Sequence, residues 1–580
     1  MAKKNLDFKL LGKVIQLAKP YRLMLTAAIG LTIFSAILAP IIPYLVKLTL
    51  DALVESVSFS KVQTYCILMV IVLIAQTVLM LFNTYISSWL GQAVIFNMRN
   101  KVYKHIINQR IAFFDKTPIG TLITRNVSDI ETITRFFSQG VITIIGDLFQ
   151  VVGIIVIMFI INWKLALVVM IMFPFLVITS RIFGRKVKKA FEQVRNSVSQ
   201  LNTIVQEYIA GIHIVQLYNA QNNALERFDK ANQAHYQANE RSVFYYSVFF
   251  PVIEIITAFT IGFIFIVASG GIGKQFIFSA GEVTAFIMLV NQFYRPIRTM
   301  ADRYNAIQMG LVSANRIFNL LEEVDYQEES DQKIQDAVLN NFDVAFHDVR
   351  FSYGQGEEVL KGISFHLTEG KTIAIVGETG AGKSTIINLI SRFYPDFGGD
   401  IRIGNVSVRD IRLDQLRNLA AVVMQDVFIF SGTLRDNIDL SKDFADEDII
   451  QAIKDLGLEQ LLLSKGLDYI VGERGTGLSL GEKQLIGFVR AILLNPPILI
   501  LDEATSSIDP ATESIIQSTI PKLTQNRTSI IIAHRLSTVE EADEIIYLSK
   551  GNIVEQGTHQ ELISKKGAYY QMQEASLINN

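Results

Sequence analysis

The stretch Gly472-Glu-Arg-Gly-Thr-Gly-Leu-Ser-Leu-Gly-Glu-Lys-Gln484 is followed closely by a second one, Ile498-Leu-Ile-Leu-Asp-Glu503. In the second stretch, four apolar residues predict a buried strand that ends in two adjacent acids. Such strands are uncommon, because two carboxylates at the edge of a core need ligands or partners. We therefore expect Asp502 to serve a Mg2+ shell and Glu503 to act on an attacking water as a base or orienting group.

A phosphate-binding pattern lies earlier in the chain. The loop that ends at Lys383 and Ser384 follows the apolar strand 372–376 and precedes a helix-like run, which is the context that this pattern requires. Its glycines let backbone N–H groups face a phosphate, Lys383 supplies positive charge, and Ser384 offers a hydroxyl to Mg2+. Together with the two acids, the loop predicts nucleotide hydrolysis. The expected nucleotide-binding residues of the loop are Gly377, Glu378, Thr379, Gly380, Ala381, Gly382, Lys383, Ser384 and Thr385.

The N-terminal half has the composition of a membrane domain. Of the 580 residues, 50% are hydrophobic and only 19% are charged, with a mean hydropathy of +0.33. Nearly all long apolar runs precede the last 250 residues or so, which alternate short strands and helices like a soluble α/β domain. Six windows are long enough to cross a bilayer, at residues 22–46, 64–90, 140–161, 164–184, 246–269 and 281–302.

Loop charge predicts the orientation of these spans. The connection 93–135 carries many Lys and Arg residues, whereas the opposite loops offer little beyond Lys61, Lys164 and Lys274. By the positive-inside rule, the long connections and both chain ends are therefore cytoplasmic. The domain boundaries that we expect are 1–325 for the transmembrane domain, 326–340 for an acidic linker and 341–580 for the nucleotide-binding domain.

The two cytoplasmic connections, 91–139 and 185–245, are too long for turns and carry apolar residues at helical spacing. We interpret each as a pair of helical arms that extends from the membrane toward the ATPase domain. The arms are predicted to break at Asp115–Gly120, where Pro and Gly occur, and at Tyr218–Asn223. Docking contacts are expected near both breaks, with plain solvated loops as the alternative.

Two acids inside the predicted spans are candidates for a substrate or proton contact. Glu254 lies close to a helix-kinking proline, Pro251, and Asp147 lies in the third span. Charged groups are costly in lipid and often line a cavity. A structural hydrogen bond or interhelical ion pair is the alternative for both residues.

The chain resembles the ABC transporter family over its whole length, because six spans followed by one P-loop domain look like a half-transporter of the exporter type. The two stretches quoted first match the family's signature and Walker B segments. The resemblance implies a multidomain membrane protein with an N-terminal all-α six-helix transmembrane domain, long cytoplasmic arms and a C-terminal α/β P-loop ATPase domain. It also implies ATP and Mg2+ as cofactors and a second half-transporter as partner.

The remaining motifs occur in the family's order. Tyr353 stands where members stack an aromatic ring on adenine, and Gln425 where a glutamine joins the metal site to the transmembrane contact. His534 matches the switch histidine near the γ-phosphate, and Ser479 and Gly481 match the signature residues that hold the partner's γ-phosphate. The resemblance thus implies two groups of site residues, the catalytic Glu503, His534 and Gln425 and the metal ligands Ser384, Gln425 and Asp502.

The signature itself departs from the usual Leu-Ser-Gly-Gly-Gln and reads Leu478-Ser-Leu-Gly-Glu482. Leu480 adds bulk. Glu482 puts an acid near a phosphate, which weakens binding unless the carboxylate points away or pairs with Lys483. The departure fits tolerated variation in a homodimer, or one half of a heterodimer in which one of the two nucleotide sites is impaired. We favour the heterodimer.

The function that we expect is ATP-driven export or flipping of a hydrophobic or amphipathic substrate, a drug or a lipid, by alternating access. The alternative is an ATP-gated channel or a regulatory subunit, which often loses the catalytic acid or the switch histidine. Both of these residues are present here. We expect a multi-pass protein of the bacterial plasma membrane that contacts membrane lipid and no nucleic acid.

Overall fold

The computed structural model describes residues 8–54, 58–269, 278–323, 337–354, 356–502, 509–533 and 536–578. The chain divides into two compact units. The first comprises Met1–Ile107 and Ile119–Glu323, and the second comprises Asn108–Pro118 and Val324–Asn580. The predicted linker falls largely on residues 324–336, which lie outside the described part of the chain.

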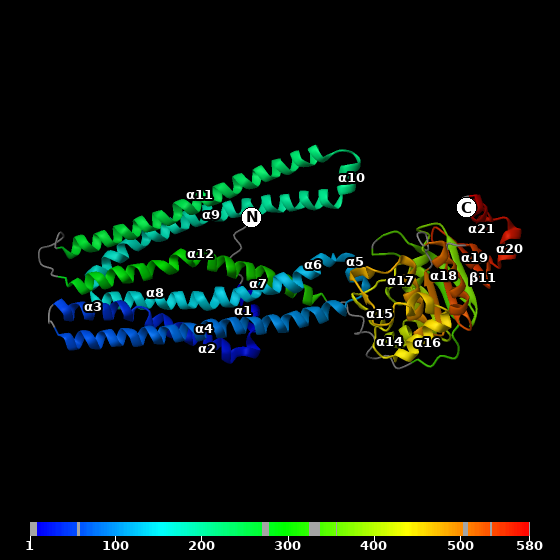
Figure 1. The fold of residues 1–580 in the computed structure, drawn as a ribbon, viewed down its shortest axis with the longest axis horizontal. Helices are drawn as coiled ribbons and strands as arrows, with labels where there is room; N and C mark the ends of the chain where they lie inside the picture. The colour runs from blue at the N-terminus through cyan, green and yellow to red at the C-terminus, as the bar shows by residue number, and fades with distance from the viewer. Residues whose placement is uncertain are drawn as a thin grey trace. The chain divides into compact units, whose positions relative to one another are not determined.

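The described part of the first unit is helical throughout (Figure 1). Its longest helices, α4 (Phe59–Ile107), α9 (Trp163–Ala210) and α11 (Gln221–Ala268), have 49, 48 and 48 residues. At 1.5 Å per residue, each is about 72 Å long, more than twice the thickness of a bilayer core. The other helical elements are α1 (Phe8–Gln16), η1 (Lys19–Tyr21), α2 (Arg22–Leu38), α3 (Ile41–Val54), α6 (Ile119–Thr124), η2 (Arg125–Asp129), α7 (Ile130–Arg135), η3 (Phe136–Val141), α8 (Ile142–Ile161), α10 (Ile212–Leu217) and α12 (Ala280–Glu322).

Five helical stretches among the described residues are long and apolar enough to cross a membrane. They contain the first five windows that the sequence predicts and are Lys19–Val54, Phe59–Ile107, Ile119–Ile161, Trp163–Ala210 and Gln221–Ala268. The sixth window lies in α12, a continuous helix that carries Asn291, Gln292 and Arg295 within the predicted span. These polar residues lower its mean hydropathy, so the count of six spans stays a prediction.

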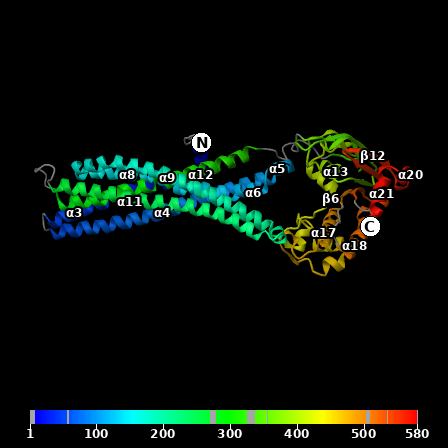
Figure 2. The ribbon, with the colours of Figure 1, turned by 90° about the horizontal axis from the view of Figure 1, so that it is seen from above.

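Both pairs of arms have the predicted helical form. Helix α4 continues without interruption from its membrane window to Ile107, and α9 and α11 run beyond theirs to Ala210 and from Gln221. Short α10 lies between α9 and α11, and the second break falls at residues 218–220, the first half of the predicted Tyr218–Asn223. The two long helices α9 and α11 lie side by side in both views (Figures 1 and 2). At the first break, residues 108–118 hold α5 (Ile111–Lys116).

Asp147 on α8 forms an ion pair with Arg303 on α12, and both side chains are mostly buried within the first unit. Arg303 also donates to the carbonyl of Thr143, at 3.1 Å. The interhelical ion pair named as the alternative for Asp147 is thus present, and a substrate or proton contact at this residue stays a prediction. Glu254 on α11 is exposed in the single chain, and its role stays a prediction.

The second unit is built around a six-stranded sheet of order β12-β11-β3-β10-β9-β6. Its central pairs, from β11 through β3, β10 and β9 to β6, are all parallel. A four-stranded sheet, β2-β1-β4-β5, and the small pair β7-β8 complete the unit. The strands are β1 (Val344–Phe351), β2 (Leu360–Leu367), β3 (Thr372–Gly377), β4 (Gly398–Ile403), β5 (Val406–Ser407), β6 (Ala420–Val423), β7 (Gly432–Thr433), β8 (Ile470–Val471), β9 (Ile498–Asp502), β10 (Thr528–Ile532), β11 (Glu544–Ser549) and β12 (Asn552–Gly557).

The central strands are apolar on both faces because both faces of the sheet are covered. In β9, Ile498 and Ile500 belong to one buried cluster and Leu499 and Leu501 to another. The predicted fold class, a helical membrane domain and an α/β nucleotide-binding domain, is confirmed. The helices of this unit are α13 (Lys383–Ile390), α14 (Leu413–Leu419), α15 (Leu434–Ile438), α16 (Asp446–Leu456), η4 (Glu459–Leu463), η5 (Glu473–Gly475), α17 (Leu480–Leu493), α18 (Pro510–Thr524), α19 (Leu536–Glu540), α20 (His559–Lys565) and α21 (Ala568–Ile578).

Candidate functional site

The phosphate-binding loop joins β3 to α13 at the carboxyl edge of the parallel sheet, where open α/β sheets bind their ligands. Gly377, Gly380 and Gly382 have φ values of 145°, 85° and 106°, which L side chains rarely adopt. A Cβ at Gly377 would lie 2.0 Å from the carbonyl oxygen of Leu548, and one at Gly382 would lie 2.8 Å from Leu360 Cδ2. Glycine is therefore required at both positions.

Lys383 is folded onto this loop. Its Nζ donates to the carbonyl of Gly377 at 2.6 Å and to that of Glu378 at 3.1 Å, and the side chain is buried. Burial lowers the pKa of the Lys383 ammonium, while the Asp502 carboxylate opposes that shift. The Lys383 ammonium therefore lies against the backbone of the loop that is predicted to bind the phosphates.

Candidate ligands for a magnesium ion come from the first turn of α13 and from the ends of the neighbouring strands β9 and β6. The Oγ of Ser384 lies 3.5 Å from Oδ2 of Asp502, the last residue of β9. A hydroxyl and a carboxylate are ligands that Mg2+ prefers, so this donor set fits the ion. Gln425 is exposed two residues after β6, which pairs with β9 through Val423 and Leu501. Asp502 and Gln425 thus lie at or just after the ends of two adjacent strands, and Ser384 approaches Asp502 from the first turn of α13.

Tyr353 lies beside the same loop. Its hydroxyl is 3.2 Å from Thr385 Oγ1 and accepts a hydrogen bond from Asn388 Nδ2 at 3.1 Å. The ring packs edge-to-face on Tyr394, with a centroid distance of 5.1 Å, and is 40% exposed. An exposed ring tethered to α13 fits the predicted stacking on a base.

Sequence reasoning missed Tyr394. Its hydroxyl donates a hydrogen bond to Asp115 in the segment 108–118, which belongs to the second unit. Burial, and then the bond to Asp115, raises the pKa of the Tyr394 hydroxyl. Phe113 of the same segment is buried, so the docking contact predicted at the first break is present. At the second break Tyr218 is 74% exposed, and its docking contact stays a prediction.

Two predicted catalytic residues, Glu503 and His534, lie outside the described residues. The strands that precede them are described. Strand β9 ends at Asp502, and β10, which ends at Ile532, pairs with both β9 and β3. The catalytic roles of Glu503, His534 and Gln425 remain predictions.

The altered signature forms the N-terminus of α17. Ser479 caps this helix, because its Oγ accepts the backbone N–H of Glu482 at 3.1 Å and its own N–H donates to Glu482 Oε2 at 2.7 Å. Gly481 is buried, while Ser479 and Leu480 are exposed. The cap places Ser479 at the N-terminus of the helix. It also directs the Glu482 side chain back toward the backbone N–H of Ser479.

Glu482 pairs with a lysine, but not with the one that the sequence suggested. Its Oε1 lies 2.6 Å from the Nζ of Lys465, whereas Lys483 donates to the carbonyl of Arg474 at 2.8 Å. Burial raises the pKa of the Glu482 carboxyl, but the Lys465 ammonium and the Ser479 N–H outweigh it, so this pKa lies below its usual range. Of the two conditions under which Glu482 would not weaken phosphate binding, a pairing with Lys483 is not the one found, because Lys465 takes that place.

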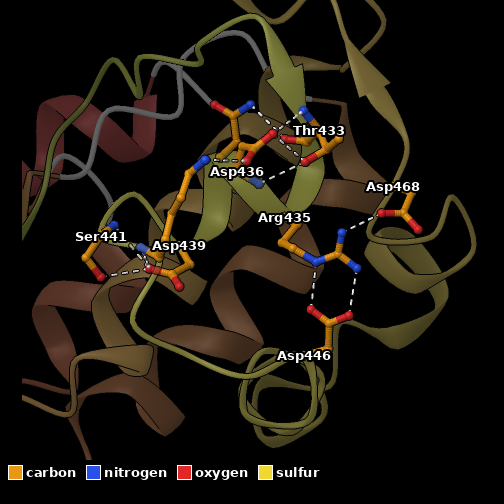
Figure 3. Close-up of polar contacts among 9 residues, drawn as sticks. Thr433, Arg435, Asp436, Asp439, Ser441, Asp446 and Asp468 are labelled. Carbon is orange, nitrogen blue, oxygen red and sulfur yellow. Dashed lines mark hydrogen bonds and ion pairs between the residues drawn. The ribbon is translucent and has the colours of Figure 1, made fainter.

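A group of acids around α15 is fully occupied by other partners (Figure 3). Arg435 bonds both carboxylate oxygens of Asp446 through Nε and Nη2, each at 2.6 Å, and also bonds Asp468. The carboxylate of Asp439 accepts the Ser441 hydroxyl and nearby backbone N–H groups. These contacts identify the cluster as a structural element of the domain.

Gly377→Ala is expected to weaken ATP binding. The added methyl group collides with the β11 backbone at a positive φ, so β3 or the loop must shift, at a cost of about 1–3 kcal/mol. Isothermal titration with ATP checks this. In the matched control, Gly370→Ala, φ is also positive, at 75°, but nothing lies within 4 Å of the added Cβ. Equal losses in the two variants would contradict the close approach at Gly377.

Comparisons with known proteins agree with the two units. Residues 25–297 match the ABC transporter transmembrane region, and residues 360–506 match the ABC transporter family. The putative ABC transporter ATP-binding protein exp8 of Streptococcus pneumoniae is 31% identical over 99% of this chain and 98% of its own. An ATP-dependent lipid A-core flippase of Desulfotalea psychrophila is 34% identical over 96% and 97%. The probable multidrug resistance ABC transporter YheH of Bacillus subtilis is 36% identical over 84% and 73%.

Proposed function

The chain belongs to the ABC transporter family, and from this premise we propose that it is one half of a dimeric exporter that moves an amphipathic substrate. It is an ATPase coupled to transport across a membrane that it crosses several times. The observation that carries the proposal is the meeting of the glycine loop, Lys383 and Asp502 at one sheet edge, in a chain whose described residues include five helical stretches able to cross a bilayer.

In the proposed site, each group of residues of this chain has a separate role. Lys383 and the loop N–H groups hold the β- and γ-phosphates, and Tyr353 supports the adenine. Ser384, Gln425 and Asp502 would hold Mg2+, which would neutralise charge that develops on the phosphates. Glu503 accepts a proton from the attacking water or orients it, and His534 contacts the γ-phosphate side. These roles rest on the motifs and on the strand ends described above.

Binding at this site drives transport if ATP prefers one of two conformations. ATP held between the P-loop of one chain and the signature of a second meets that condition only when the two ATPase domains are closed on each other. We propose that closure turns the cavity outward and that hydrolysis resets it. The Tyr394–Asp115 hydrogen bond supports this coupling. It joins the segment 108–118 to Tyr394, and the ring of Tyr394 packs against Tyr353, the proposed support of the adenine.

For the substrate, we propose a hydrophobic or amphipathic lipid or drug. The support is in the relatives' names, which include a lipid A-core flippase and a probable multidrug resistance transporter. The location that we propose is the bacterial inner membrane, with the ATPase domain and both termini in the cytoplasm. The excess of Lys and Arg in the connection 93–135 supports that orientation.

For the partner, we propose that a homodimer suffices for hydrolysis. The electrostatic reason for an impaired signature is weakened, because Glu482 is paired with Lys465 and turned into a helix cap. The heterodimer, favoured from the sequence, remains the second candidate. The heterodimer is supported by the bulk of Leu480, which is 47% exposed at the N-terminus of α17.

The test is ATP hydrolysis by the chain purified alone in lipid nanodiscs, with mass determination. A dimer that hydrolyses ATP is the expected result. A silent chain that becomes active only with a second half-transporter would establish the heterodimer. Absence of hydrolysis in both preparations, with ATP bound, would contradict the proposed function and favour a regulatory subunit.

A further inference from the structure

The turn before the signature is held by a lysine and a tyrosine from the segment that follows η4. Lys465 Nζ bonds Glu482 Oε1 at 2.6 Å and lies 3.4 Å from the carbonyl oxygen of Gly477. The Tyr469 hydroxyl also donates to the Gly477 carbonyl at 3.4 Å, and the Lys465 ammonium lies 5.3 Å from the centre of the Tyr469 ring. A Cβ at Gly477 would come within 2.9 Å of that hydroxyl, so the turn fits closely against Tyr469.

We propose that Lys465 is a positioning residue that makes a glutamate compatible with phosphate binding at this signature, by neutralising Glu482 and fixing the turn that presents Ser479. This inference rests on the proposed function, in which the tip of α17 meets ATP held by the partner chain. Lys465 itself is proposed to touch neither nucleotide nor metal. It acts through Glu482 and through the Gly477 carbonyl.

Charge and burial explain why the pair is needed. The Glu482 and Lys465 side chains are only 12% and 28% exposed, so neither charge is well solvated without the other. With Lys465 in place, Glu482 adds no net charge at the helix end, where the N-terminal dipole attracts a phosphate. Without it, a poorly solvated carboxylate faces the site that an anion must approach. Lys483 does not replace Lys465, because its ammonium is bonded to the Arg474 carbonyl.

The test is a set of four variants of the full chain, assayed for ATP hydrolysis in nanodiscs in the dimer that is active. Lys465→Met is expected to lower kcat/KM for ATP roughly tenfold. This is less than the effect of breaking a fully buried pair, because both side chains keep some access to solvent. Lys465→Arg keeps the charge and is expected to stay within about threefold of the unsubstituted chain. The double variant Lys465→Met/Glu482→Gln is expected to recover to the same level, because glutamine still accepts the Ser479 N–H and leaves no unpaired charge. Lys454→Met, which removes an exposed lysine of α16, is the control for loss of a lysine from the same domain.

The pH profile separates positioning from a merely structural role. In Lys465→Met, burial still raises the pKa of Glu482 and the Ser479 N–H still lowers it, but the opposing effect of the lysine is lost, so this pKa should be higher than in the unsubstituted chain. Activity relative to the unsubstituted chain should therefore rise as the pH falls and Glu482 takes up a proton. The double variant has no carboxylate there and should show no such relative rise. Failure of the double variant to recover, or equal pH profiles in the two variants, would overturn the inference. Such a result would leave the proposed function standing, because that function fails separately if the unsubstituted chain hydrolyses no ATP, either alone or with a second half-transporter.

Discussion

Replacing Lys383 by alanine is expected to reduce ATP hydrolysis by roughly 100-fold or more, as removal of one preorganised electrostatic group does in other active sites. The substitution removes the charge proposed to hold the β- and γ-phosphates. It also leaves the carbonyls of Gly377 and Glu378 without the donor that they have at 2.6 and 3.1 Å. Steady-state phosphate release and titration with an ATP analogue measure both consequences.

The matched control for this prediction is Lys371→Ala. Lys371 precedes β3 in the same domain and forms an exposed ion pair with Asp543 at 2.7 Å, on the opposite end of the strand from the loop. Exposed pairs contribute little to stability, so hydrolysis should remain close to that of the unsubstituted chain. Hydrolysis by Lys383→Ala at the level of the control would contradict the assignment of the loop.

Glu503→Gln is expected to lower kcat by roughly 100-fold or more while ATP binding is retained, because glutamine keeps the shape of the side chain but takes up no proton. Glu503 directly follows Asp502, whose carboxylate lies beside Ser384 at the sheet edge. Single-turnover hydrolysis and equilibrium binding of ATP separate the chemical step from binding.

Retained ATP binding is the part of this result that separates a catalytic role of Glu503 from a role in binding. The glycine loop, Lys383 and Tyr353 are unchanged in Glu503→Gln, so its affinity for ATP should match that of the unsubstituted chain. With ATP bound and hydrolysis stopped, the closed dimer should accumulate, which cross-linking across the interface can detect. An undiminished kcat would show that another group activates the water.

The architecture was largely predictable because it depends on local patterns. Strands β3 and β9 are short apolar runs followed by glycines or acids, and the loop has a fixed spacing that only one strand–loop–helix geometry satisfies. The arms were predictable for a similar reason, since α4, α9 and α11 continue as helices beyond their apolar windows. Helix α12 was harder, because its polar residues weaken the hydropathy signal that defines a span.

The partners of site residues were not predictable, because they come from contacts between distant segments. Neighbouring charges in the sequence suggested Lys483 as the partner of Glu482, but the turn after η4 brings Lys465 nearer. The Tyr394–Asp115 bond joins residues 279 positions apart, and no local pattern indicates it. Hydrophobic periodicity locates helices and strands, whereas these pairs depend on how the elements are packed together.

The most direct test of ATP-driven export is transport by the chain reconstituted in proteoliposomes, measured with a fluorescent phospholipid and an amphipathic dye. Hydrolysis and probe movement are measured in the same preparation, for the unsubstituted chain and for Glu503→Gln. We predict that at least one probe moves only when ATP is hydrolysed, and that Glu503→Gln moves neither. Probe or ion movement that persists in Glu503→Gln with ATP bound would contradict export and identify an ATP-gated channel.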